Sequence, residues 1–79
     1  MSIFASKLKL FKHERKYNRI KVVLAEKDKT GIWLSEKVGK SNNTVSKYIN
    51  QKVQPDLITL NAIAYALEVD VKDLLVSNL

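Results

Sequence analysis

Hydrophobic residues recur every three or four positions from residue 18 to residue 75, which is the spacing of amphipathic helices rather than of strands. Polar residues, glycine or proline interrupt this pattern at four places and divide it into five short segments. We therefore expect an all-α fold, a compact domain of five helices.

The first two expected helices are separated by one short polar connection. The first helix has Asn18 as its N-cap and ends near residues 28–29. Its inward-facing apolar positions are Ile20, Val23 and Leu24. Thr30 caps the second helix, whose Leu34 and Val38 point inward, and Ser35 is small enough for a close helix contact. Gly39 then supplies the left-handed conformation that ends a helix.

The last two expected helices follow a loop over residues 51–56, because Pro55 cannot continue a helix. Asp56 is the expected N-cap of the fourth helix. Its inward stripe consists of Leu57, Leu60, Ile63, Ala64 and Leu67. A short fifth helix begins at Asp70 and brings in Val71, Leu74 and Leu75.

We expect residues 1–17 to be an N-terminal arm, ordered at most in part, that precedes a domain at residues 18–79. Lys7 to Leu10 alternate as in a strand, whereas Phe4, Leu8 and Phe11 are spaced as on a helix. An extended or partly helical arm, a dimer contact and a frayed terminus all fit this pattern.

The charge is unevenly distributed along the 79 residues. The net charge is +6, but residues 1–55 carry +9 and residues 56–79 carry −3. A basic body with an acidic end fits a polyanion-binding face, and a solvated lysine-rich surface fits equally well. The chain has no cysteine, and its longest apolar run, 62–67, is too short to span a bilayer. We expect a cytoplasmic protein with no membrane association.

Catalysis is not expected. The single histidine, His13, lies in a run of charged residues, and two glycines are too few for a phosphate-binding loop. Glu68, Asp70 and Asp73 form the densest carboxylate cluster, but Asp70 as an N-cap and Asp73 near a helix N-terminus explain it better than a metal. No cofactor or metal site is predicted.

The third helix, from Ser41 to about Asn50, carries the functional signal. One side is polar, with asparagine, serine and lysine side chains, and the other is apolar, with Val45, Tyr48 and Ile49. Asparagine and serine are poor helix formers, so their concentration indicates a role other than folding. Asparagine pairs with adenine and lysine reaches guanine in the major groove of DNA. The expected base contacts are Asn42, Asn43, Ser46 and Lys47, and a phosphate contact is an equal alternative for Asn42.

These residues resemble the DNA-binding domain of phage Cro/repressor proteins and XRE-like bacterial regulators. The resemblance covers residues 18–75 through NRIK, WLSEKVGKSNNTVSKY and QPDLITLNAIAYALEVDVKDLL. It implies a lambda-repressor-like five-helix domain with a helix-turn-helix at the second and third helices. It also implies a homodimer that binds double-stranded DNA at a pseudo-palindromic operator.

The family's DNA-backbone contacts are carried over by position. Asn50 and Lys52 fall just after the recognition helix, and Arg19 and Lys21 at the start of the first helix have weaker support. The full expected set of backbone contacts is Thr30, Gly31, Thr44, Asn50, Lys52, Arg19 and Lys21.

Three features, one of them a pair of residues, depart from the family. Gly31 stands where many members carry a phosphate-binding glutamine, although its own N–H can still bind phosphate. Ile49 and Leu24 replace a glutamate and its basic partner, a substitution that is often neutral or stabilising. Trp33 stands where charged residues are common, and we favour packing over contact with the arm or a partner.

Two functional hypotheses follow. The first is a sequence-specific transcriptional regulator, a repressor that inserts residues 41–50 into the major groove. The alternative is an antitoxin or restriction-modification controller that acts partly through a protein partner. Its contacts would be Trp33, the arm from Ile3 to Phe11, and Leu74, Leu75 and Leu79.

Overall fold

The structure, a computed structural model, describes residues 16–77, and the expectations that fall on residues 1–15, 78 and 79 lie outside this range. Within it, four α-helices are followed by a short 3-10 helix: α2 (Ile20–Glu26), α3 (Gly31–Val38), α4 (Asn42–Ile49), α5 (Leu57–Leu67) and η1 (Val71–Leu74). The all-helical fold agrees with the prediction. The fifth helix does not, because only a four-residue 3-10 helix forms after Asp70.

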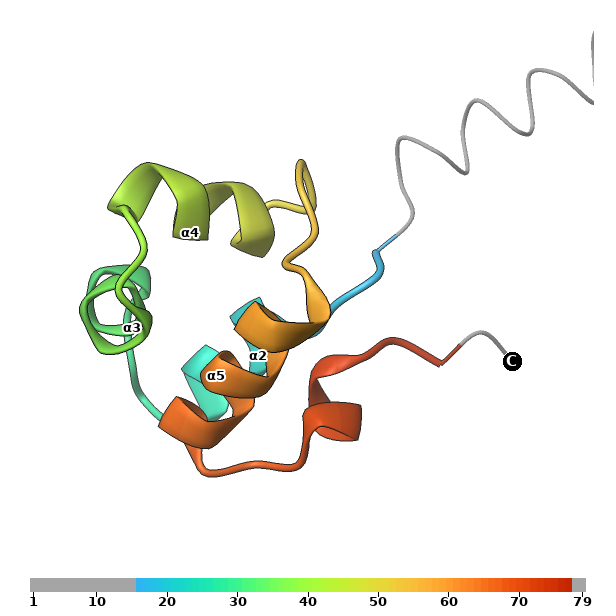
Figure 1. Ribbon diagram of the computed structural model, residues 1–79. Coiled ribbons are helices and arrows are strands. Elements are labelled where there is room, and N and C mark those ends of the chain that lie inside the picture. The colour runs from blue at the N-terminus through green and yellow to red at the C-terminus, as the bar shows by residue number, and fades with distance from the viewer. Residues whose placement is uncertain (1–15, 78–79) are drawn as a thin grey trace, which may run out of the picture.

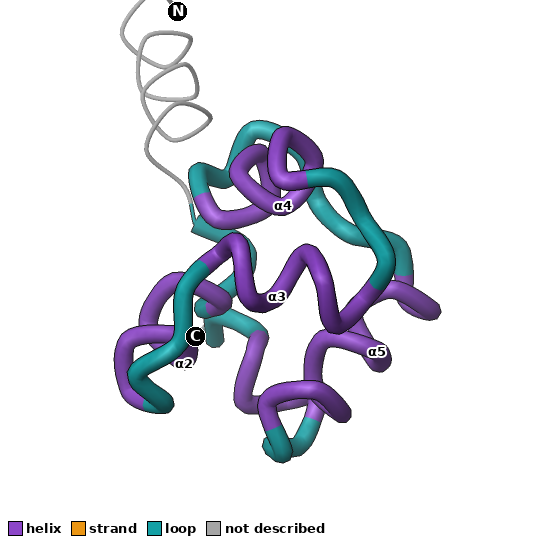
Figure 2. The backbone as a smooth tube through the Cα atoms, turned by 90° about the vertical axis from the view of Figure 1, so that its left-hand side faces the viewer, coloured by secondary structure: helices purple, strands orange, loops and turns teal. Residues whose placement is uncertain are grey.

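Each helix contributes one buried stripe to a single core. Ile20, Leu34, Val45, Ile63 and Leu74 are all completely buried, and they come from five different elements. In Figure 1, α4 lies along the upper side of the domain and α5 crosses beneath it. Figure 2 looks onto α3, which runs between α4 and α5 and packs against both. The core thus fixes α4 on one outer side of the molecule.

The predicted caps at Thr30, Ser41 and Asp56 are present. The Thr30 hydroxyl accepts from the Trp33 N–H at 3.0 Å, and the Ser41 hydroxyl accepts from the Thr44 N–H at 3.1 Å. Asp56 accepts from the Thr59 N–H at 2.7 Å. Each cap satisfies a backbone donor that the first turn of a helix leaves free.

Acid is expected to weaken the fold through Asp56. Hydrogen bonds from the Thr59 side chain and then from its backbone N–H hold the pKa of Asp56 below its ordinary value. A carboxyl with a lowered folded-state pKa stabilises the fold above its unfolded pKa and loses that contribution as pH falls through the folded value. Unfolding midpoints measured from about pH 6 to about pH 2 should therefore fall more steeply for the wild type than for Asp56→Asn, which keeps the acceptor. Equal slopes for the two proteins would contradict this assignment.

Three expectations about individual residues were wrong. Leu57 does not face the core but is 70% exposed, because it lies in the first turn of α5, at the edge of the buried stripe. Leu75 is also exposed, and it forms an isolated antiparallel bridge with Asn18 instead of continuing a helix. Leu74 is completely buried in the core and is therefore not available as a contact for a partner.

The two ends of the described chain lie side by side. Beyond the bridge, the Arg19 N–H donates to the Leu74 carbonyl at 2.8 Å and the Val76 N–H donates to the Tyr17 carbonyl at 3.2 Å. As a result α2 begins at Ile20, with Arg19 at the N-cap position and no side-chain cap. Asn18, the expected cap, still accepts from the Ile20 N–H through its side chain at 3.0 Å.

Candidate nucleic-acid interface

The turn between α3 and α4 is short and consists of Gly39, Lys40 and Ser41. Gly39 ends α3 with φ 69°, in the left-handed region, and its N–H donates to the Ser35 carbonyl. The Lys40 N–H donates to the same carbonyl at 3.1 Å, and Ser41 then caps α4. Two helices joined in this way form a helix-turn-helix, as the sequence predicted.

The two sides of α4 differ in the way that the pattern predicted. Val45 and Tyr48 are buried and Ile49 packs partly against the core. The opposite side is exposed to solvent and consists of Asn42, Asn43, Ser46, Lys47 and Asn50. We call these five residues the polar face of α4. The core anchors the helix while this face stays available to a ligand.

Some side chains of the polar face form hydrogen bonds within the protein and others do not. The Asn50 amide donates to the Ser46 hydroxyl at 3.3 Å, one turn back along the chain. Within the described part of the chain, the side chains of Asn43 and Lys47 make no hydrogen bond or ion pair. These two residues are one turn apart on the helix, so they can reach the same ligand without breaking an internal contact.

Asn42 is tied to α3. Its side-chain oxygen lies 3.0 Å from the hydroxyl of Ser35, which is almost fully buried and also lies 2.7 Å from the Ile32 carbonyl. A hydroxyl has a single proton, so both contacts are satisfied together when the Asn42 amide turns to donate to the hydroxyl. In either orientation, one polar group of Asn42 supports the packing of α4 on α3.

The N-terminus of α3 lies beside the polar face. A shallow hollow there is lined by Thr30, Gly31, Ile32, Asn42, Ser46 and Ile49. The Thr30 hydroxyl is occupied by the Trp33 N–H. Thr44, also expected to contact the DNA backbone, does not line this hollow, and its hydroxyl accepts from the Ser41 hydroxyl at 2.9 Å. The free N–H groups of a helix N-terminus favour an anion such as a phosphate oxygen.

Gly31 and Ile49 are directly coupled across this hollow. A Cβ atom built on Gly31 would lie 3.0 Å from the Ile49 Cδ1 atom, closer than ordinary van der Waals contact. The tip of the isoleucine thus crowds the position that the Cβ atom of any other residue at position 31 would take. The two departures noted in the sequence are therefore one structural feature.

This coupling predicts a non-additive double substitution. Gly31→Gln alone should lower the free energy of unfolding by about 1 kcal/mol or more, because the new side chain displaces the tip of Ile49. In an Ile49→Ala background, the same change should cost less, and the coupling should amount to about 0.5–3 kcal/mol in denaturant unfolding. Additive costs would show that the two side chains do not compete for space.

A hydrogen-bond network holds the C-terminal end of α4. Gln51 adopts a left-handed conformation, with φ 65°, and its side-chain oxygen accepts from the N–H groups of Tyr17 and Asn18. Buried Asn18 donates in turn to the Tyr48 carbonyl at 3.0 Å and to the Gln54 side chain at 2.8 Å. This network links α4 to the residues just before α2, and no hydrophobic or capping pattern in the sequence predicts it.

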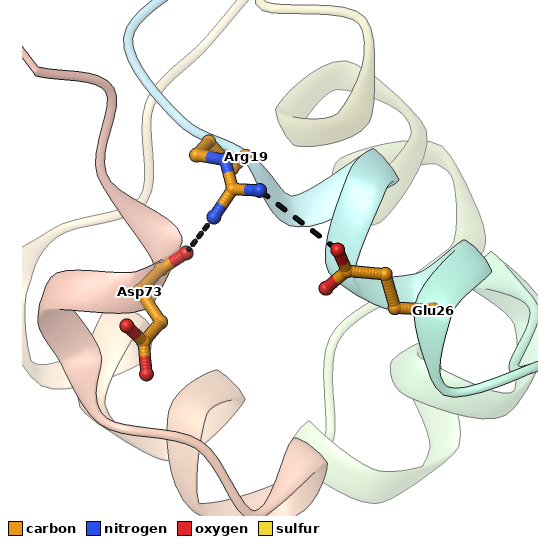
Figure 3. Close-up of polar contacts among 3 residues, drawn as sticks. All are labelled: Arg19, Glu26 and Asp73. Carbon is orange, nitrogen blue, oxygen red and sulfur yellow. Dashed lines mark hydrogen bonds and ion pairs between the residues drawn. The ribbon is translucent and has the colours of Figure 1, made fainter.

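The remaining candidate cations lie in different surroundings. Lys52 and Lys21 are exposed, as a phosphate contact requires. The Arg19 guanidinium instead donates to the Asp73 carbonyl at 3.0 Å and lies 4.0 Å from a Glu26 carboxylate oxygen (Figure 3). Arg19 therefore ties η1 to α2, and these contacts compete with DNA for its guanidinium.

Residues 16–77 were also compared with the geometry of a metal site and of a membrane span. No group of three potential metal ligands comes together in this range, and Asp70 accepts from the Lys72 N–H at 3.1 Å, as an N-cap does. None of the described helices is long and apolar enough to cross a membrane. Trp33 packs partly against the core, as favoured, with the Lys29 and Lys37 ammonium groups 5.0 and 5.8 Å from its ring centre.

Comparison with known proteins agrees with this geometry. The model of the Cro/C1-type helix-turn-helix DNA-binding domain matches residues 19–78, nearly the whole described chain. The chain belongs to this family. A crystal structure of a candidate DNA-binding protein from Bacteroides fragilis is also similar, with 52% sequence identity and a TM-score of 0.72. The match covers 73% of this chain and 94% of that one. No curated protein is significantly similar to the chain.

Membership of the Cro/C1-type family makes α3 and α4 a DNA-binding helix-turn-helix. The family model begins at Arg19, so it includes α2 and the residues of the hollow but not Asn18. The amide side chains of Asn18, Gln51 and Gln54 were the available sequence signal for the network, since buried amides need partners.

Proposed function

We propose that the chain is a sequence-specific transcriptional repressor in which α4 enters the major groove of a pseudo-palindromic operator, with one copy on each half-site. The observation that carries this proposal is the polar face of α4, which is exposed over its full length while the opposite side is anchored in the core. Groove-reading helices need this combination, because base contacts depend on a fixed backbone. The proposal places the protein in the cytoplasm, on the nucleoid.

Asn43 and Lys47 are the proposed base readers. Both side chains are exposed, and no contact with another residue in 16–77 competes with DNA for them. Asn43 has the geometry for adenine and Lys47 for guanine. Ser46 and Asn42 are proposed as further base contacts, with Asn42 limited by its tie to Ser35.

The remaining contacts are proposed for the DNA backbone. The N–H groups of the α3 N-terminus, at Thr30 and Gly31, are proposed to bind a phosphate oxygen at the hollow beside α4. Thr44, Asn50 and the two exposed lysines, Lys52 and Lys21, extend this set on either side. Arg19 is the weakest member because it is already engaged.

Selection of bound sites from random duplex DNA tests the proposal. We expect one enriched motif with two-fold symmetry and half-site centres about 10 base pairs apart, one turn of the duplex. A reporter gene carrying this motif in its promoter should be expressed less when the protein is present. A bound pool with the same composition as the input would overturn sequence-specific binding.

Substitution of the base readers gives a second test. Asn43→Ala and Lys47→Ala should each cost about 1–3 kcal/mol on the selected site and relax discrimination at one base pair per half-site. Lys52→Ala is the matched control, which should weaken binding to all sequences alike. Equal loss on specific and random DNA for Asn43→Ala would remove its assignment as a base reader.

A further inference from the structure

Two neighbouring hollows lie where residues 27–37 meet the C-terminal end of α5. Their volumes are about 850 Å³ and about 180 Å³, and both are lined by Trp33 and Glu68. We call the two hollows together the Trp33 groove. Its apolar surface comes from Trp33, Tyr65 and Val69 and from alanine side chains of α5. The volume of the larger hollow is in the range of ligand sites.

The Trp33 groove is basic. The charged residues that line it are Lys27, Lys29, Lys37 and Glu68, and all four are exposed. Three positive charges and one negative charge leave a net +2 on this lining. Among residues 16–77, none of the four side chains forms an ion pair. Asp28 and Glu36 are neighbours of these lysines in the sequence but line neither hollow. The positive charge of the groove is therefore available to an acidic ligand.

Two of the lysines are held beside the aromatic ring. The ammonium groups of Lys29 and Lys37 lie over the Trp33 ring, 5.0 and 5.8 Å from its centre. An ammonium group is attracted to the electron-rich face of an indole, so both charges stay next to the apolar surface. The groove thus presents positive charge and apolar contact side by side.

This combination fits an acidic peptide segment better than a nucleic acid. A base would have to stack on the indole where the two ammonium groups lie. The Glu68 carboxylate lines both hollows and repels phosphates, whereas it can accept a hydrogen bond from a peptide N–H. Carboxylates of a peptide complement the lysines, and charge complementarity of this kind selects a partner.

We propose that the Trp33 groove binds an acidic peptide segment of a partner protein. An apolar side chain of the peptide packs against Trp33 and Val69, and its flanking carboxylates pair with Lys29 and Lys37. The groove shares no residue with the polar face of α4 or with the proposed DNA-backbone contacts. The inference therefore goes beyond the proposed function and does not depend on it.

A synthetic peptide tests the proposal. The probe has about 12 residues, carries fluorescein, and alternates aspartate and glutamate with leucine and phenylalanine. Its fluorescence anisotropy with the full chain should rise to saturation, and the binding should weaken as salt is added. A peptide with asparagine and glutamine in place of the acids should bind at least about 10-fold more weakly.

Substitution of the two lysines over the ring locates the site. Lys29→Gln combined with Lys37→Gln should raise the dissociation constant of the acidic peptide about 5-fold or more, because two exposed ion pairs are lost. Lys16→Gln combined with Lys72→Gln is the matched control, since it removes two charges from exposed lysines outside the groove. The control should bind the peptide like the wild type. Circular dichroism should show the same helix content for both variants, because all four lysines lie outside the core.

The outcomes separate this proposal from the proposed function. Absence of saturable binding, which is also the result if a second copy of the chain covers the groove, would overturn the proposal. Equal weakening by the two double variants would overturn it too, since only net charge would then matter. Displacement of the peptide by an unlabelled single-stranded oligonucleotide would make the groove a nucleic-acid site instead. Peptide binding at the groove by a chain that selects no DNA site would support this proposal and refute the operator.

Discussion

Affinity for the operator is expected to fall about 10³–10⁵-fold when the salt concentration rises from about 50 to about 200 mM. Each lysine that contacts a phosphate releases a counterion that was condensed on the DNA. The free energy gained from this release decreases as the salt concentration increases. A dimer that neutralises about 6–10 phosphates gives this steepness. In the proposed dimer, the exposed Lys21 and Lys52 of both copies supply four cations for phosphates, and the two exposed base-reading Lys47 side chains add two more positive charges to the same surface.

The slope of log affinity against log salt measures this effect. In a dimer, Lys52→Ala should make the slope shallower by about 2, one unit per protomer. Arg19→Ala should change the slope little, because its guanidinium is already engaged by Asp73 and Glu26. A slope near zero for the wild type would mean that phosphates contribute little and would contradict the proposed set of backbone contacts.

Asn18→Ala should give the largest loss of stability among the polar residues, about 2–4 kcal/mol. Its amide is buried and bonds the Tyr48 carbonyl, the Gln54 side chain and the Ile20 N–H. Removing it leaves several of these groups without a partner, and each buried unsatisfied group costs about 1–3 kcal/mol. Urea unfolding followed by circular dichroism measures the change.

Asn61→Ala is the matched control for Asn18. The Asn61 amide is exposed and donates only to a carbonyl of its own helix, so its loss should cost less than about 0.5 kcal/mol. If the two substitutions lowered the free energy of unfolding by the same amount, the hydrogen-bond network around Gln51 would not contribute significantly to the stability of the fold. Because that network ends at Tyr48, Asn18→Ala should also weaken specific DNA binding at temperatures where the protein remains folded.

The sequence predicts interactions between neighbouring residues, such as helix caps, but not hydrogen bonds between residues far apart in the chain. Thr30, Ser41, Asp56 and Gly39 act on backbone groups within a few residues, so residue type alone predicts their conformations. The bonds of Asn18 to residues around Gln51 span more than 30 positions, and no periodicity encodes them.

Two misjudged elements have a similar physical cause. Leu57 belongs to the apolar pattern of α5, but a pattern cannot tell which apolar residue at the edge of a stripe stays in water. The segment after Asp70 has room for one turn only before Leu75 pairs with Asn18, so it closes as a 3-10 helix. In both cases the outcome depends on packing or pairing with residues far away in the sequence. The polar face of α4 could be predicted because its composition contradicts helix propensity, whereas the ties of Asn42 and Arg19 could not.

The contact between Gly31 and Ile49 also constrains how this domain can diverge. A long side chain introduced first at position 31 would push against the isoleucine tip, which a Cβ atom there would meet at 3.0 Å. A smaller residue at position 49 would remove this strain, although that step opens a gap beside Val45 at some cost in stability. Mutational paths between the two kinds of sequence therefore have a preferred order. Libraries that vary both positions together will reach combinations that stepwise screening rejects.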